Sequence, residues 1–347
     1  MDSMISQVSS LLFTSYKEDN VAFTSSRQFP PKNTTTILTH LQALFFPDFF
    51  LRKTERNLRH TSAYLTELVE ILRYGLSAYN EEDLVEDALQ NVLINFLRIR
   101  SEIKEDIVAA YAGDPAAPGL AIIIRSYPGI QAVMAYRLAH ILYTTGDREY
   151  CREMMEEIHS LTSIDIHPGA KIDSHFFIDH GVGVVIGETA EVGKWCRMYQ
   201  EVTLGAINFK EENGIIKRGT KRHPTVGDNV VIGTGAKVLG NITIGNNVKI
   251  GAKCWIVESI EDGNTVFISQ HPTQTTRENK HITVVNDKFV LQKLEDKETQ
   301  KRNKDSDSIT KEDEKVSSLE ETSSSPDILM ELSCTLLSHN FPMKCNV

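Results

Sequence analysis

Six consecutive hexapeptides constrain the fold of this chain more than any other feature of its sequence. Between Val226 and Glu261 they read VGDNVV, IGTGAK, VLGNIT, IGNNVK, IGAKCW and IVESIE. The first and fifth residues of every hexapeptide are apolar, and the small ones occupy the fifth position. A period of six fits neither the 3.6-residue turn of an α-helix nor the alternation of a half-buried strand. It is typical of a parallel β-helix, in which each hexapeptide forms one flat side and three form a coil.

The same register continues toward the N-terminus. The inward positions there are Ile166, Ile172 and Ile178, and after a skip of two residues Ile186, Val192, Met198 and Leu204. An ordinary sheet rich in Val, Ile and Gly would not keep six repeats in phase, and a solenoid coil needs stacked neighbours to bury its faces. We therefore expect a β-helix over residues 161–268. It is interrupted by a loop at 205–225, and loops that leave a solenoid usually carry its binding function.

The residues before the β-helix follow a helical period instead. One apolar stripe consists of Leu58, Leu65, Leu68, Leu72 and Leu76, and a second of Leu84, Ala88, Val92, Phe96 and Ile99. The stripes meet at Tyr79-Asn80, which suits a turn between two helices. This pattern predicts an α-helical N-terminal domain over residues 1–160.

The residues after the β-helix have a different composition. Between Glu295 and Glu321 there are ten acidic and six basic residues and no aromatic ones. Such a segment buries too little apolar surface to offset the entropy lost on ordering. Hydrophobicity returns only near the end, for example at Ile328–Met330. We expect a C-terminal extension over 269–347 that is mostly disordered, with a short partner-binding element near its end as the alternative.

The overall composition excludes several classes of function. The net charge is −10 and no basic face stands out, so nucleic-acid binding has no support. Five cysteines without paired spacing are typical of a reducing compartment. The opening residues MDSMISQVSSLLF lack the cationic region of a secretory signal. The apolar run Gly119–Ile124 is too short to cross a bilayer. We expect a cytoplasmic protein.

Polar residues that a structural coil does not require gather in the first part of the β-helix. His180 lies at the two-residue skip and follows Asp165 by slightly less than one coil of three hexapeptides. That spacing would stack the carboxylate against the imidazole, where it could orient the ring as a general base. A lone histidine on a solenoid face is more often a solvated residue, and spacing alone leaves both interpretations open. Likewise Asp114, in an Asp-Pro pair, could be a simple turn residue.

Several motifs together resemble serine O-acetyltransferase, the hexapeptide-repeat enzyme of cysteine biosynthesis. They are DIHPGAKI, DHGVGVVIGETA, VTLG, KRHP and IGTGAKVLGNI in the β-helix, with GDPAA and YRLAH in the helical part. The resemblance covers roughly residues 100–260. It implies an α+β architecture, with an N-terminal helical bundle followed by a left-handed parallel β-helix. It also implies transfer of an acetyl group from acetyl-CoA to the hydroxyl of L-serine.

The resemblance assigns roles to individual residues. It implies that His180 is the general base and that Asp165 orients it. Asp114 and Asp179 would meet the ammonium group of serine, and Arg222 and His223 its carboxylate.

The family also binds acetyl-CoA as co-substrate in a groove between subunits. The matching positions are Gly205, Thr234, Gly235, Lys249, Gly251 and Ala252. The resemblance implies no metal. It implies a homotrimer, which many relatives pair into a dimer of trimers.

Departures from the family pattern occur in the loop and at the end of the chain. Residues 206–221 replace a short glycine-rich loop, and the chain ends in Val347 where relatives that bind O-acetylserine sulfhydrylase end in isoleucine on an acidic tail. We therefore do not expect that complex to form.

Three other functions remain as alternatives. The first is acetylation of a sugar or another neutral hydroxyl acceptor, which would not need both Asp114 and Arg222. The second is a zinc-dependent carbonic anhydrase with His167, His180 and His223 as ligands. The third is a non-enzymatic scaffold, which would tolerate loss of Asp165 and His180.

Overall fold

The structure, a computed structural model, describes residues 2–18, 29, 32–207, 211–212, 215–216, 219–268 and 274–278. The greater part of the predicted C-terminal extension, including Val347, and the middle of the 205–225 loop lie outside these residues. In this described part of the chain, no helix combines the length and apolar character needed to cross a membrane.

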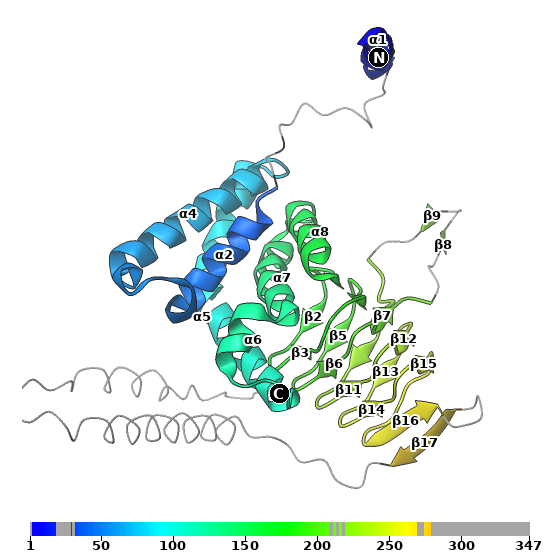
Figure 1. Cartoon of the computed structure of the whole chain (residues 1–347). Coiled ribbons are helices and arrows are strands. Elements are labelled where there is room, and N and C mark those ends of the chain that lie inside the picture. The colour runs from blue at the N-terminus through cyan, green and yellow to red at the C-terminus, as the bar shows by residue number, and fades with distance from the viewer. Residues whose placement is uncertain are drawn as a thin grey trace, which may run out of the picture. The chain divides into compact units, whose positions relative to one another are not determined.

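Helices form the N-terminal part, as the apolar stripes predict. They are α1 (Asp2–Glu18), α2 (Thr34–Phe45), α3 (Pro47–Phe50), the 3₁₀ turn η2 (Lys53–Glu55), α4 (Leu58–Ser77), α5 (Glu82–Gly113), α6 (Leu120–Ser126), α7 (Pro128–Thr145) and α8 (Tyr150–Thr162). On the first stripe Leu68, Leu72 and Leu76 are buried, but Leu58 is 84% exposed because it is the first residue of α4. Helices α5, α7 and α8 contact the β-helix, whereas α2 and α4 lie farther from it (Figure 1).

Three sheets form the sides of a prism, which confirms the predicted parallel β-helix. The first sheet contains β1 (Ile164–Ile166), β4 (Val184–Ile186), β7 (Thr203–Gly205), β12 (Lys237–Leu239) and β15 (Trp255–Ile256). The second contains β2 (Lys171–Ile172), β5 (Glu191–Val192), β10 (Thr225–Val226) and β13 (Thr243–Ile244). The third contains β3 (Phe177–Ile178), β6 (Arg197–Met198), β11 (Val231–Ile232), β14 (Lys249–Ile250) and β16 (Asn264–Ile268).

Two antiparallel additions depart from the repeat. Strand β17 (Gln274–Glu278) pairs with β16, inside the segment predicted to be mostly disordered. Within the loop, β8 (Glu211–Glu212) pairs with β9 (Ile215–Ile216). Neither addition carries a hexapeptide signal.

The pairing register accounts for the phase skip. Thr225 pairs with Thr243, one regular coil of three hexapeptides later, whereas the partner of Ile164 is Val184, which lies beyond the end of a regular coil. The extra residues of this first coil fall between β3 and β4, in the turn that contains His180. All of the predicted first positions are buried, and of the fifth positions only Ile242 and Ile260 are partly exposed.

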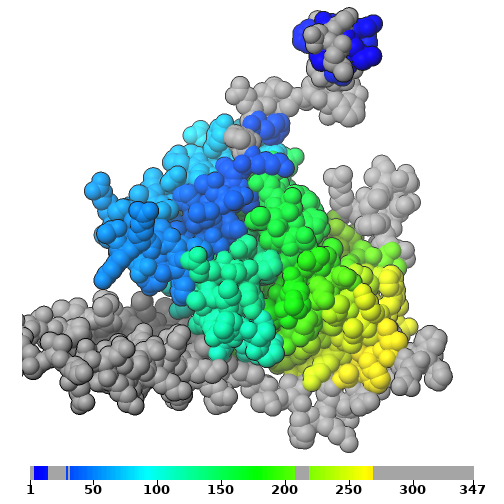
Figure 2. Space-filling model, viewed as in Figure 1, coloured from blue at the N-terminus to red at the C-terminus, as the bar shows by residue number. Residues whose placement is uncertain are grey.

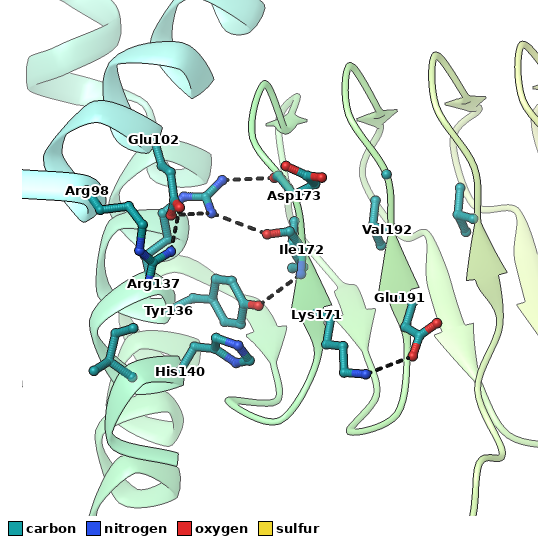
Figure 3. A pocket seen from close by; sticks show the side chains of 13 residues that line it. Arg98, Glu102, Tyr136, Arg137, His140, Lys171, Ile172, Asp173, Glu191 and Val192 are labelled. Atoms are coloured by element: carbon teal, nitrogen blue, oxygen red, sulfur yellow. Dashed lines mark hydrogen bonds and ion pairs between the residues drawn. The ribbon is translucent and has the colours of Figure 1, made fainter. Parts of the chain in front are cut away.

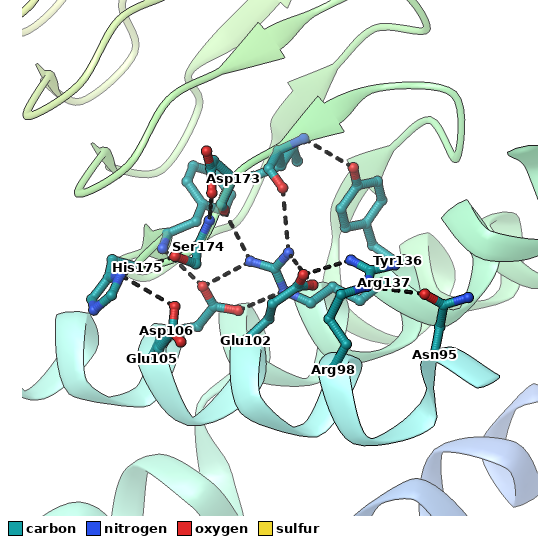
Figure 4. Close-up of polar contacts among 12 residues, drawn as sticks. Asn95, Arg98, Glu102, Glu105, Asp106, Tyr136, Arg137, Asp173, Ser174 and His175 are labelled. Carbon is teal, nitrogen blue, oxygen red and sulfur yellow. Dashed lines mark hydrogen bonds and ion pairs between the residues drawn. The ribbon is translucent and has the colours of Figure 1, made fainter. Parts of the chain in front are cut away.

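A buried ionic cluster joins the helices to the first coil. Arg137 of α7 donates from Nε and Nη2 to both carboxylate oxygens of Asp106 on α5, at 2.8 and 2.9 Å. The same guanidinium donates to the carbonyl oxygens of Ile172 and Asp173, and Asp106 accepts the N–H of Phe176 at 2.8 Å (Figure 4). Asp106 is fully buried. The cluster therefore fixes the first coil, and with it the turn after β3, against α5 and α7. In the space-filling view these helices and the β-helix form one continuous body (Figure 2).

Candidate functional site

The predicted site residues divide between two corners of the prism. Residues 179–183, between the third and first sheets, form what we call the His180 corner, together with the turns at 199–202, 233–236 and 251–254 stacked on it. Residues 187–190 and 221–224, between the first and second sheets, form the Arg222 corner. Strand β4 separates the two: His180 precedes it, and the residues that contact Arg222 follow it.

The His180 corner brings together the predicted base and two carboxylates. His180 Nε2 lies 3.8 Å from Asp179 Oδ1, and the imidazole is 69% exposed, whereas the Asp179 side chain is 14% exposed. Burial raises the pKa of Asp179, and the nearby Asp114 carboxylate raises it further, while His180 opposes the shift. Asp114, at the C-terminal end of α5, accepts a short hydrogen bond from the hydroxyl of Tyr127. The two carboxylates make this corner suited to a cationic group, although the nearby Arg197 also opposes the rise in the pKa of Asp179.

The left-handed backbone of His180, with φ of 60°, lies in the extra residues of the first coil and outside the repeat. The left-handed residues that stack in register at this corner are Gly183, Glu201, Gly235 and Lys253, with φ of 72°, 61°, 69° and 60°. Backbone hydrogen bonds join these turns, from Glu201 N to Val182 O, Gly235 N to Gln200 O and Lys253 N to Thr234 O. Gly183 therefore fills the left-handed position of the repeat in the first coil, and the two-residue insertion between β3 and β4 determines where the His180 imidazole projects.

The predicted contact between Asp165 and His180 is wrong for the single chain. Asp165 lies on β1 and forms an ion pair with Arg152 of α8 at 3.3 Å, and within the described residues no hydrogen bond or ion pair joins it to His180. The spacing misleads because the first coil is longer than three hexapeptides. The residue across from Asp165 is Val185, and His180 lies earlier in the chain, on the corner.

At the Arg222 corner, the predicted carboxylate-binding residues are held in place by neighbours. Arg222 donates to Glu188 Oε2 at 2.6 Å, and Tyr143 of α7 donates to the other oxygen at 2.9 Å. Burial raises the pKa of Glu188, but these two hydrogen bonds outweigh it and hold that pKa below its usual value. Thr189 Oγ1 accepts the backbone N–H groups of Arg222 and His223. The Arg222 guanidinium is therefore held in a fixed position.

Gly187, which precedes Glu188 and Thr189, allows the His223 imidazole to lie close to the backbone. A Cβ on Gly187 would lie 2.1 Å from Nε2 of His223, so only glycine allows the imidazole to pack there. Burial lowers the pKa of His223 to about 4. His223 is therefore a neutral ring at pH 7, and its Nδ1 accepts the N–H of Thr189 at 3.1 Å.

The positions predicted to bind acetyl-CoA are also divided. Thr234, Gly235, Gly251 and Ala252 lie in the turns of the His180 corner, and Lys249 lies on β14, just before that corner. Gly205 ends β7, on the side of the Arg222 corner. A ligand that contacted all of them on one copy would have to span the first sheet.

A separate cavity of about 580 Å³ contains none of the predicted site residues. It lies between α5 and α7 and the second sheet, and most of its charged side chains form ion pairs, as in Lys171–Glu191 and Arg98–Glu102 (Figure 3). We interpret it as part of the junction between the helices and the β-helix.

Comparisons with known proteins identify the family. Residues 223–257 match the model described as bacterial transferase hexapeptide (six repeats). Serine acetyltransferase 1 of Entamoeba histolytica, solved in complex with L-cysteine, is 56% identical, with a TM-score of 0.66 over 77% of this chain and 99% of that chain. This chain belongs to the serine acetyltransferase family.

Two further relatives extend the comparison. The plasmid serine acetyltransferase of Synechococcus elongatus is 51% identical over 146 residues, which cover 42% of this chain and 46% of that protein. The chain spans about half the length of the curated relatives it matches. The serine acetyltransferase of Brucella abortus, solved in complex with coenzyme A, is 25% identical, with a TM-score of 0.50 over 73% of this chain and 85% of that chain.

Some residues at these corners had no predicted role. Glu188 and Thr189 belong to a motif quoted for the family, but only their contacts to Arg222 and His223 reveal what they do. Tyr127 and Arg152 belong to none of the motifs quoted from the sequence. Contacts between α5, α7, α8 and the β-helix cannot be inferred from a repeat pattern.

Within the described ranges, no group of three His, Cys, Asp or Glu side chains is arranged to hold a metal ion. The three histidines of the zinc alternative do not meet in one chain, since β4 separates His180 from His223.

Two buried neutral histidines predict a pH-dependent stability. Burial lowers the pKa of His167 as well as His223 to about 4, against ~6.5 in an unfolded chain. The folded protein binds fewer protons than the unfolded chain in this range, so its free energy of unfolding should fall as pH drops from about 6.5 toward 4.

Urea unfolding at pH 7.0 and 5.0 measures this fall. His223→Asn keeps an acceptor near the position of Nδ1 but cannot be protonated there, so its loss of stability between the two pH values should be smaller. His60→Asn, at an exposed residue of α4, is the matched control. An equal loss in wild type and His223→Asn would contradict the assignment.

Proposed function

We propose that this chain transfers the acetyl group of acetyl-CoA to the hydroxyl of L-serine, giving O-acetyl-L-serine and CoA. This is the first step of L-cysteine biosynthesis from L-serine. Membership of the serine acetyltransferase family supports the reaction type. The observation that carries the choice of acceptor is that the chain has both a corner with two carboxylates and a corner with a preorganised arginine, which together match both charges of an amino acid.

In this proposal His180 is the general base. It removes the proton of the serine hydroxyl as the oxygen attacks the thioester carbonyl carbon of acetyl-CoA. The tetrahedral intermediate then expels the CoA sulfur, which takes the proton back from the imidazolium. Positioned base catalysis of this kind contributes ~10²–10⁴-fold. Asp165 would orient the base only after exchanging its present partner, Arg152.

The substrate requires both corners at once. Asp114 and Asp179 would hold its ammonium, and Arg222 and His223 its carboxylate, but β4 separates the two pairs within one chain. A cyclic assembly removes this separation, because the His180 corner of one copy can face the Arg222 corner of the next. We therefore propose a homotrimer with active sites between subunits. The pairing of trimers into a dimer of trimers through the helices is left to measurement.

Acetyl-CoA would lie in the same groove. The coenzyme A complex of the Brucella abortus relative supports this co-substrate. Gly235 and Gly251 would allow close backbone approach, with Thr234, Ala252 and, across the groove, Gly205 beside them. Lys249, exposed before the corner, would meet the nucleotide phosphates. The proposal includes no metal and places the protein in the cytoplasm, and it includes no complex with O-acetylserine sulfhydrylase.

An acceptor panel tests the function. Thiol release from acetyl-CoA should be fastest with L-serine and far slower with L-threonine, L-homoserine and a sugar. Fast release with the sugar and none with L-serine would favour the alternative of a neutral acceptor. Release with none of them would contradict the proposed reaction.

Two substitutions separate recognition from chemistry. Asp114→Ala and Arg222→Ala should each raise the KM for L-serine by a factor equivalent to about 1.5–3 kcal/mol, because each leaves one charge of the zwitterion unpaired. Titration with L-serine at saturating acetyl-CoA measures this. Arg98→Ala, on the exposed face of α5, is the control for Arg222→Ala. Unchanged KM and kcat would remove the substituted residue from the site.

A further inference from the structure

Tyr127 is the residue at the His180 corner that the sequence did not point to. Its hydroxyl donates to Oδ2 of Asp114, while Oδ1 of Asp114 accepts the backbone N–H of Ala116 at 2.8 Å. Both oxygens of this carboxylate are therefore held, and its orientation is fixed from two sides. One of the two donors is a side chain that can be changed without altering the backbone.

The position of Tyr127 relative to the base is fixed by packing. The next residue, Pro128, begins α7, and a Cβ on Gly129 would lie 2.3 Å from the carbonyl oxygen of Ile178. The start of α7 therefore packs directly against the end of β3, one residue before Asp179. Because this contact is between backbones, Tyr127 keeps its place beside Asp179 and His180.

The charges at the corner are consistent with this position. Burial, the hydrogen bond to Asp114 and the negative charges of Asp114 and Asp179 raise the pKa of Tyr127 to about 12. The phenol thus stays protonated at neutral pH and remains a donor. The same hydrogen bond is the largest cause that lowers the pKa of Asp114. Asp114 is kept ionised beside a second carboxylate, Asp179, whose pKa is raised.

We propose that Tyr127 is a positioning residue for substrate recognition, which holds the Asp114 carboxylate ionised and aimed at the ammonium group of the amino-acid acceptor. The inference rests on the proposed function and adds a residue to its acceptor site. It predicts a role in binding the acceptor and none in the chemical step. If Tyr127 had only a structural role, its substitution would instead impair folding or change both kcat and the KM for L-serine.

The substitution Tyr127→Phe removes the hydroxyl and keeps the ring. The KM for L-serine should rise about tenfold, since a charge-assisted hydrogen bond is lost, while kcat and the KM for acetyl-CoA change less than twofold. Tyr74→Phe, the same change at an exposed residue of α4, is the matched control and should behave as wild type.

A double-mutant cycle excludes an indirect effect. In an Asp114→Asn background, Tyr127→Phe should raise the KM for L-serine by less than twofold, because the carboxylate on which it acts is gone. Full additivity of the two changes would overturn the inference, as would an unchanged KM in active Tyr127→Phe protein. A wild-type protein that does not acetylate L-serine would instead overturn the proposed function itself.

Discussion

Replacing His180 by alanine should lower kcat for serine acetylation by ~10²-fold or more, because the hydroxyl loses the base that removes its proton. The KM for acetyl-CoA should change little, since the predicted contacts of the coenzyme lie in other turns. The side chain is 69% exposed in the single chain, so its removal leaves no cavity in the β-helix. Steady-state kinetics with both substrates measures the effect.

Two further variants complete this test. His60→Ala, on the exposed surface of α4, is the control and should keep wild-type turnover. Asp165→Asn should lower kcat less than His180→Ala does, because Asp165 pairs with Arg152 rather than with the base. Folded His180→Ala protein that retained more than about a third of wild-type turnover would contradict a base mechanism, which requires a loss of at least ~10²-fold.

Replacing Arg137 by methionine should lower the free energy of unfolding by about 3–5 kcal/mol. The change leaves the Asp106 carboxylate, which is fully buried, without its counter-charge, and it leaves the carbonyl oxygens of Ile172 and Asp173 without their donor. The loss should be greatest at the junction between the helices and the first coil. Unfolding in guanidinium chloride, followed by circular dichroism, measures it.

The control for this change is Arg98→Met. Arg98 lies near the buried ionic cluster but is largely exposed. Arg98 pairs with Glu102 across one helical turn and is 52% exposed, so its loss should cost less than about 1 kcal/mol. A double variant, Arg137→Met with Asp106→Leu, should recover part of the stability, because no unpaired charge remains buried. Equal stability of Arg137→Met and wild type would contradict the role of this cluster as an anchor.

The sequence was most informative about the β-helix, and the physical reason is its periodicity. A residue such as Ile232 or Val238 must point inward because every coil repeats the same geometry, and both are fully buried. The additions outside the repeat, such as β17 and the β8–β9 hairpin, follow no period and were not predicted. The helices were predicted as a class, but the docking of Arg137 on the first coil depends on tertiary contacts between distant segments.

The sequence predicted only in part how the candidate site residues lie relative to one another. The spacing from Asp165 to His180 looked like a coil, but the two-residue insertion that places His180 on its corner also displaces it from Asp165. Asp114 and Asp179 do gather beside His180, although the sequence could not reveal that Tyr127 holds Asp114. The site residues fall on two corners because β4 lies between them. That position of β4 is known only from the strand pairing in the structure.

The most direct test of the account asks whether serine is acetylated where two copies of the chain meet. His180→Ala and Arg222→Ala chains, coexpressed with different tags and purified through both, should regain activity when assayed at an L-serine concentration far below the KM of the Arg222→Ala protein. A mixed trimer has one interface in which an intact His180 corner faces an intact Arg222 corner. The account predicts about a third of wild-type turnover per trimer. The matched control pairs His180→Ala with Asp114→Ala, which damage the same corner and should not rescue each other. Mixed His180→Ala and Arg222→Ala protein that stays as inactive as its separate parents would contradict a site assembled from two copies.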